Sequence, residues 1–179
     1  GSIDSSAGSP LINTNTSLKN CFFGSDISNI TTIGSWNIDN VISLEGTFEQ
    51  SKSLLNLDLQ NWNTENISNM NRMFADVSGI PQNINLFQLD SIVSMTEMFI
   101  NVSIPYATYD LILNTWGNNE KGTYVDFNAG NSKYSASGED GKERLISNLK
   151  WIITDNGLID PYEDENFTDI DVNSNCNQQ

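Results

Sequence analysis

Apolar residues recur along the chain with a long period and with a short one. Phenylalanine occupies four positions that lie 26, 26 and 25 residues apart, namely Phe22, Phe48, Phe74 and Phe99. Around the last two of these, apolar residues fall at i, i+3, i+4 and i+7, as in Met70, Met73, Phe74 and Val77. This spacing predicts one apolar face of a short helix in each repeat.

The polar residues that flank these segments support the same interpretation. A residue that caps helices well precedes each first apolar position. The four residues are Ser17, Ser43, Asn69 and Ser94. Ser94 together with Glu97 also has the spacing of a capping box. The sequence therefore predicts that each short helix begins at the same point of its repeat.

Between the predicted helices the pattern changes to alternation. Leu55, Leu57 and Leu59 occupy every second position, and so do Ile84 and Leu86. Alternation of this kind predicts a short strand with one face directed inward. Each repeat is then a short helix, a loop, a short strand and a turn. One such unit cannot bury its own apolar face, whereas stacked units share a continuous core.

A tryptophan position accompanies the phenylalanine position. Trp36 and Trp62 each stand twelve residues before a repeat phenylalanine, and Phe87 takes the same place in the next repeat. Because this position is fixed in the repeat, we expect core side chains there rather than platforms for sugar stacking. The Asn and Asp residues that follow are expected in turns, where their side chains bind their own backbone.

The repeated motif resembles that of a known family. Trp62-Asn-Thr, Ile67-Ser-Asn-Met70 and Met73-Phe74-Ala75 are similar to the BspA-like leucine-rich repeat of bacterial surface proteins, which has a period of about 26 residues. The resemblance implies an α/β repeat solenoid, a leucine-rich-repeat-like stack of about four short helix–strand units with a mixed α+β C-terminal cap. It also implies a cell-surface or secreted bacterial protein that adheres to host or neighbouring-cell proteins or glycans.

Four segments are predicted along the chain. Residues 1–12 are interpreted as an N-terminal lead-in that begins with an expression scar, residues 13–104 as the repeat solenoid and residues 105–159 as the C-terminal cap. Within the cap we expect a helix over 109–116, a strand and turn over 125–134, a second helix from 144 and a final strand before 155. Residues 160–179 form an acidic tail or linker, and the chain is expected to be part of a larger chain or assembly.

Composition and charge exclude several function classes. The formal net charge is −15 and the basic residues are scattered singly, which disfavours nucleic acid as a partner. No apolar run approaches the length of a membrane-spanning helix, so membrane insertion by this segment is not expected. The chain has no histidine, which excludes Ser-His-Asp and Cys-His nucleophilic sites and the commonest zinc ligand. We therefore expect no enzymatic activity.

The cysteines do not form a disulfide framework. Cys21 and Cys176 are far apart in the sequence. Cys21 falls one residue before Phe22, at the repeat position that Met73 and Met98 also occupy. We therefore interpret Cys21 as a buried free thiol, and the alternative of a bond to Cys176 stays open.

The outward face of the predicted strands is the candidate ligand-binding surface, because repetition makes an extended platform there. In the predicted register, one row contains Thr32, Asp58 and Asn83, and the next contains Gly34, Gln60 and Asn85. The ligand-binding candidates are Thr32, Asp58, Gln60, Asn83 and Asn85. The alternative is that these are solvated polar residues without a ligand.

The acidic tail suggests one metal and no other cofactor. Asp169, Asp171, Asn173 and Asn175 place oxygen side chains at every second residue, as in a calcium-binding loop. The glycine at loop position six and the glutamate at position twelve of that motif are absent. A solvated linker without calcium is therefore the alternative.

Two functions are kept at this point. The first is a non-enzymatic adhesion or ligand-binding domain whose exposed solenoid face binds an extracellular protein or glycan. The second is an architectural spacer or assembly module of a larger surface fibre, pilus or virion. The fold itself does not decide between them.

Overall fold

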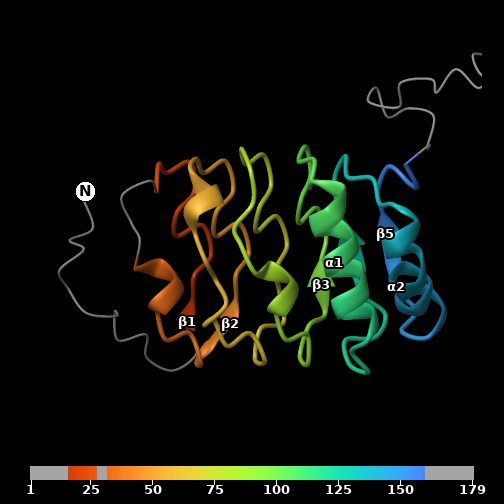
Figure 1. Cartoon of the computed structure of the whole chain (residues 1–179). Coiled ribbons are helices and arrows are strands. Elements are labelled where there is room, and N and C mark those ends of the chain that lie inside the picture. Colours follow the sequence, from red (N-terminus) through yellow and green to blue (C-terminus); the bar gives the residue numbers. More distant parts are fainter. Residues whose placement is uncertain (1–15, 28–31, 160–179) are drawn as a thin grey trace, which may run out of the picture.

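The computed structural model describes residues 16–27 and 32–159, which form a small α/β domain (Figure 1). Its three-stranded parallel sheet has the strand order β3 (Ser94–Met95), β4 (Asp126–Asn128) and β5 (Ile152–Thr154). Two helices accompany the sheet, α1 (Tyr106–Gly117) and α2 (Ala136–Ser147). A second pair of strands, β1 (Thr16–Ser17) and β2 (Val41–Ser43), is also parallel. The lead-in over residues 1–12 and the tail over residues 160–179 lie outside the described residues.

Single parallel bridges connect the two groups of strands. Ser43 pairs with Asn69, and Asn69 pairs with Ser94. The residues that the sequence suggested as helix N-caps thus lie side by side on one parallel ladder that runs through successive repeats. Each repeat contributes one short stretch of parallel pairing to this ladder, and we call this stretch a rung.

The segment that follows each rung is a run of turns, so the helices predicted within the repeats are wrong. In the second repeat the N–H groups of Thr47 and Glu49 donate to carbonyl oxygens three residues earlier, at 3.1 Å each. The N–H groups of Gly46 and Phe48 instead donate to the next repeat, at 2.8 and 3.0 Å. An α-helix would instead pair N–H groups with carbonyl oxygens four residues earlier in the same segment. Here every second one links two repeats.

Left-handed backbone conformation makes this alternation of turns possible. Two residues in each run of turns have positive φ, four positions apart. The first set has φ between 54° and 59°, and comprises Asn20, Gly46, Arg72 and Glu97. The second set has φ between 56° and 64°, and comprises Gly24, Gln50, Asp76 and Asn101. Five of these eight residues are Gly, Asn or Asp, which tolerate this region best.

Three of the four predicted capping residues, Ser17, Ser43 and Asn69, do cap, but they cap turns. Asn69 Oδ1 accepts the N–H of Asn71 at 2.8 Å, and Ser43 Oγ accepts the N–H of Glu45 at 3.3 Å. The capping box predicted for Ser94 and Glu97 is wrong, because Glu97 forms an ion pair with Arg72 of the preceding repeat. A short polar side chain two residues before a free N–H serves a turn as well as a helix.

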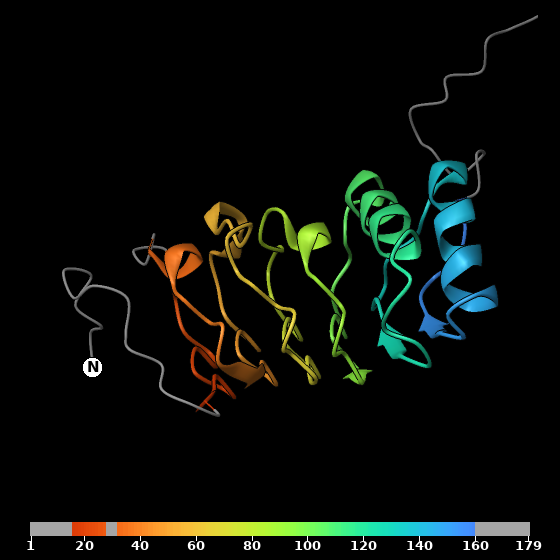
Figure 2. The ribbon, with the colours of Figure 1, turned by 90° about the horizontal axis from the view of Figure 1, so that it is seen from below.

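The strands predicted between the helices are also corrected. Short 3-10 helices occupy the opposite side of the repeats: η1 (Ile33–Ser35), η2 (Leu54–Asn56) and η3 (Ile84–Leu86). Because η2 and η3 replace alternation with a tight turn, Leu55 and Leu86 are exposed, while Leu57 and Leu59 are buried as expected. The 3-10 helices and the two α-helices follow one another along one side, and the strands line the other (Figure 2).

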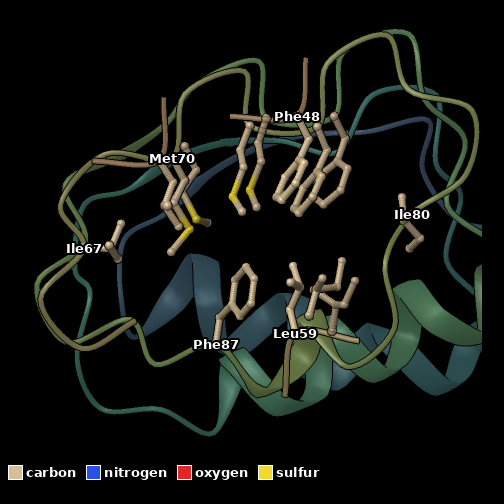
Figure 3. Close-up of a cluster of buried hydrophobic side chains, with 14 of the residues drawn as sticks. Phe48, Leu59, Ile67, Met70, Ile80 and Phe87 are labelled. Atoms are coloured by element: carbon tan, nitrogen blue, oxygen red, sulfur yellow. The ribbon is translucent and has the colours of Figure 1, made fainter. Parts of the chain in front are cut away.

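The core between these two sides contains the repeated aromatic side chains (Figure 3). Phe22, Phe48, Phe74 and Phe99 are buried and stack with ring centroids 5.4, 5.7 and 5.4 Å apart. Trp62 is buried beside them and donates its Nε1–H to the carbonyl oxygen of Ile33 in the preceding repeat, at 2.8 Å. The predicted phenylalanine column and the core role of the tryptophans are confirmed.

The C-terminal elements follow the predicted order of helix, strand, helix and strand. α2 begins at Ala136, eight residues before the predicted start at Arg144. The buried carboxylate of Asp110 on α1 accepts the N–H of Ser135, the N-cap of α2, at 2.9 Å. A Cβ on Gly138 would lie 2.4 Å from the same carboxylate, so the glycine permits this close approach of the two helices.

The burial predicted for Cys21 is wrong. Cys21 is exposed, although its repeat equivalents Thr47, Met73 and Met98 are fully buried. It lies on the first rung of the described ladder, so no described repeat packs on the side that covers its equivalents. Partial burial still raises the pKa of its thiol. Cys176 lies outside the described residues.

Replacing Phe74 with alanine tests the aromatic column. Phe74 stacks on both Phe48 and Phe99, so Phe74→Ala opens a cavity in the middle of the column. We expect the free energy of unfolding to fall by about 3–5 kcal/mol, measured by urea denaturation. Phe23 is half-exposed, and Phe23→Ala should change it by less than about 0.5 kcal/mol. Equal losses for the two variants would contradict the packing described here.

Candidate functional site

Three of the predicted ligand-binding residues meet around one carboxylate. Asp58 Oδ1 accepts a hydrogen bond from the side-chain amide of Asn83 at 2.8 Å and from the backbone N–H of Gln60 at 2.9 Å. Asp58 and Asn83 belong to neighbouring repeats, so the contact crosses between two units. The register that grouped Asp58 with Asn83 is therefore correct for this pair.

These hydrogen bonds hold Asp58 in its ionised form. The amide of Asn83 and then the N–H of Gln60 lower the pKa of Asp58, because both donate to the carboxylate. A carboxylate only accepts hydrogen bonds. The NH₂ group of Asn83 must consequently face Asp58, and its side-chain carbonyl oxygen is left for other partners.

Thr32 and Gly34 do not extend this group. Thr32 is exposed at the start of η1, and its carbonyl oxygen accepts the N–H and the hydroxyl of Ser35, at 3.0 and 2.7 Å. No hydrogen bond within the described ranges joins Thr32 to Asp58. The outward position predicted for Gly34 is wrong, because Gly34 is buried and a Cβ there would lie 1.8 Å from the carbonyl oxygen of Asp58. Gly34, the first residue of the second predicted row, therefore lies at a contact between two repeats and not on an outward face.

The candidate residues also lie on a different side from the one predicted. Thr32 and Asn83 precede η1 and η3, so the rows run along the side of the 3-10 helices (Figure 2), where Asp58 forms an isolated parallel bridge with Gln82. α1 continues the same side and packs against η3. The candidate surface is therefore bounded by α1, the first long helix among the described residues.

A groove of about 560 Å³ lies where η3 meets α1. Of the five predicted residues, Asn83 and Asn85 line it, and Thr32, Asp58 and Gln60 do not. Its remaining lining residues are Leu55, Gly79, Ile80, Pro81, Gln82, Ile84, Ser103, Pro105, Thr108 and Leu111. Sequence patterns missed most of these, because Leu55 was assigned to the core and Leu111 belongs to a helix expected only to cover the stack.

The groove offers exposed leucines and free polar groups. The side chains of Leu55 and Leu111 are 62% and 51% exposed, although both are large and apolar. Within the part of the chain that the structure describes, the polar side chains of Asn85, Ser103 and Thr108 have no hydrogen-bond partner. Exposed apolar side chains among convergent polar groups are typical of binding sites.

The groove lining offers hydrogen bonds and apolar contact. None of the lining residues is ionisable, so the groove holds no acid–base pair and no carboxylate pair. Amides, hydroxyls and leucines can orient a ligand by hydrogen bonds and by apolar contact.

Charged residues form structural clusters elsewhere. Arg72 bonds Glu49 of the preceding repeat at 2.7 Å and pairs with Glu97 of the following one, which raises the pKa of Arg72. Arg72 thereby joins three repeats. In the cap, the buried carboxylate of Asp155 accepts the hydroxyl of Tyr109 at 2.7 Å and pairs with Lys142 at 2.8 Å. Burial and then the charge of Asp155 raise the pKa of Tyr109.

Two further sequence predictions concern ligands and membranes. Among residues 16–27 and 32–159, no group of three or more Cys, Asp and Glu side chains is placed to hold a metal ion. The calcium candidates Asp169, Asp171, Asn173 and Asn175 lie outside these ranges. None of the described helices combines the length and the apolar character needed to cross a membrane.

Comparison with known proteins places the repeats in a family. Residues 16–121, or 106 of the 179 residues, match a family model described as "Mycoplasma protein of unknown function, DUF285". The chain belongs to the DUF285 family. DUF285 is a family of leucine-rich-repeat-like proteins, and its model here spans the rungs through β3 together with α1. No curated protein and no solved structure matches the chain.

The contact between repeats at Gly34 can be tested by adding one methyl group. In Gly34→Ala the new Cβ would collide with the carbonyl of Asp58, so the two repeats must move apart. We expect the free energy of unfolding to fall by about 2–3 kcal/mol in urea denaturation. Gln60 holds the equivalent position of the next repeat and is exposed, so Gln60→Ala should cost less than about 0.5 kcal/mol. A neutral Gly34→Ala variant would rule out this contact.

The lowered pKa of Asp58 predicts a pH-dependent contribution to stability. An unfolded aspartate has a pKa of about 3.9. Because the folded value is lower, the ionised carboxylate stabilises the fold fully above the unfolded pKa, and this contribution is lost as the pH falls through the folded value. Wild type should therefore exceed Asp58→Asn in urea midpoint at pH 7, and the difference should shrink in acid.

The donor that lowers this pKa provides the control. Asn83 has a φ of 61°, so Asn83→Gly keeps the backbone conformation while it removes the amide that donates to Asp58. In the Asn83→Gly background, the loss of urea midpoint caused by Asp58→Asn should depend less on pH. A loss of equal size at neutral and acidic pH in the wild-type background would contradict the role given to these hydrogen bonds.

Proposed function

We propose that this chain is a non-enzymatic adhesion or ligand-binding domain of a bacterial cell-surface or secreted protein. Its ligand is an extracellular protein or glycan, and the groove between η3 and α1 receives it. The observation that carries this proposal is the groove lining, which combines exposed leucines with unpaired amide and hydroxyl groups and contains no ionisable side chain.

We further propose that the repeats form a leucine-rich-repeat-like solenoid of the BspA-like type. The parallel bridges at each rung, the stacked phenylalanines and the hydrogen bonds between successive repeats support this architecture. The DUF285 match supports the repeat character of residues 16–121. An extracellular location agrees with the many neutral polar residues and with the low proportion of charged ones, 17%.

An architectural spacer is the second candidate. The Arg72 cluster joins three repeats, and the hydrogen-bonded ladder connects each repeat to the next. Such continuous linkage suits a rigid segment that separates other domains without a ligand of its own. The two candidates differ in whether the groove binds anything.

Binding to a combined array of glycans and extracellular proteins separates the two functions. We expect saturable binding of the full chain that Leu55→Arg reduces at least tenfold, because the charge and length of arginine disturb the exposed leucine wall of the groove. Gln60→Ala lies outside the groove lining and should bind as wild type. Absence of any saturable binding would favour the spacer, and unchanged binding by Leu55→Arg would place the ligand outside the groove.

A further inference from the structure

We propose that the groove between η3 and α1 binds an extended, basic polypeptide segment that carries aliphatic side chains. This inference rests on the proposed ligand-binding function and names the class of ligand. Three features of the groove lead to it: its apolar wall, the orientation of its amides and the charge of the protein around it.

The apolar wall consists of aliphatic side chains. The two exposed leucines that line the groove come from separate elements, Leu55 from η2 and Leu111 from α1. Pro105, just before α1, also lines the groove. Branched aliphatic surfaces suit aliphatic side chains of a ligand. Sugar rings commonly pack against aromatic side chains, and none lines the groove. The wall therefore favours a polypeptide over a sugar ring.

The amides beside this wall are turned so that they accept hydrogen bonds. The NH₂ group of Asn83 donates to Asp58 at 2.8 Å, and the NH₂ group of Gln82 donates to the carbonyl oxygen of Leu55 at 3.3 Å. Both partners can only accept, which fixes the orientation of the two amides. Their side-chain carbonyl oxygens are left without a described partner. A ligand with regularly spaced N–H donors, such as an extended backbone, satisfies them.

Charge decides between basic and acidic segments. The chain has 23 acidic and 8 basic residues. Asp58 is ionised directly behind Asn83, and no cationic side chain lines the groove to receive an acidic ligand. The long-range field of such a protein attracts cations and repels anions. Lysine or arginine residues beside the aliphatic ones are therefore expected in the bound segment.

Selection from a display library of random dodecapeptides on the immobilised full chain tests this class of ligand. We expect enriched peptides with at least two aliphatic residues and a net positive charge. A synthetic peptide from this pool should bind Leu111→Arg at least tenfold more weakly than wild type, in fluorescence anisotropy. Its affinity should also fall with rising salt, since charge attraction is screened.

The matched control is a second arginine on an exposed apolar helix position. Ile146 on α2 is 40% exposed and lies outside the groove lining, so Ile146→Arg adds the same charge without touching the groove. Equal weakening by Leu111→Arg and Ile146→Arg would show attraction to the general surface and overturn the proposal. Circular dichroism confirms that both variants are folded before binding is compared.

The remaining outcomes separate this inference from the proposed function. Enrichment of acidic peptides, or of none that depends on Leu111, overturns the basic polypeptide ligand. If glycans from an array bind wild type but not Leu111→Arg, the ligand class is wrong while the ligand-binding function stands. If neither peptides nor glycans bind in a groove-dependent manner, both are overturned.

Discussion

The hydrogen bonds between successive repeats are the constraint on which the other features depend. In the first three turn runs, alternate N–H groups cross to the carbonyl oxygens of the following repeat, at distances between 2.8 and 3.1 Å. This linkage holds neighbouring repeats at the spacing of parallel strands, about 4.8 Å. The phenylalanine rings that point inward must follow nearly the same interval, and their centroids lie 5.4 to 5.7 Å apart. The polar ladder and the aromatic column therefore specify one register together.

The groove arises where the short 3-10 helices on one side of the repeats give way to a long α-helix. η1, η2 and η3 each have three residues, whereas α1 has twelve. A 3-10 helix is narrower than an α-helix. The side of the protein that carries both therefore has a step where η3 meets α1. Leu55 turns outward at η2 and Leu111 is exposed on α1, and both line the groove at this step. The site thus follows from the junction between repeats and cap and not from a motif inside any repeat.

The sequence predicted the repeat, the aromatic column and the order of the cap elements, because each depends on which residues are apolar. It did not predict the backbone within the repeats. Met70, Met73 and Phe74 point inward from a run of turns just as they would from a helix, so the apolar spacing does not distinguish the two. Positive φ at fixed positions does distinguish them, and Gly46 and Asn20 carry that signal. Arg72 and Glu97 at the equivalent positions conceal it.

The same limit applies to the site. Asp58 and Asn83 could be paired from the repeat register alone, since that pairing needs only the period. The groove could not, because it depends on Leu55 turning outward at η2 and on where α1 packs. The groove therefore brings together residues that are far apart in the sequence, and no regular spacing connects them. The predicted Asn83 and Asn85 line that surface because their repeat is the one next to α1.

The N–H groups of a turn run donate toward the following repeat, and this direction affects how the first described rung could pair with another molecule. On the first described rung, the carbonyl oxygens of Ser17, Lys19, Cys21 and Phe23 receive no N–H from the described residues, whereas their equivalents in the second repeat each accept one. This edge offers acceptors and no donors from its turn run. Two copies meeting there around a twofold axis would oppose carbonyl to carbonyl, and such like dipoles repel. The turn run of the first described rung is therefore poorly suited to symmetric pairing with a second copy of itself.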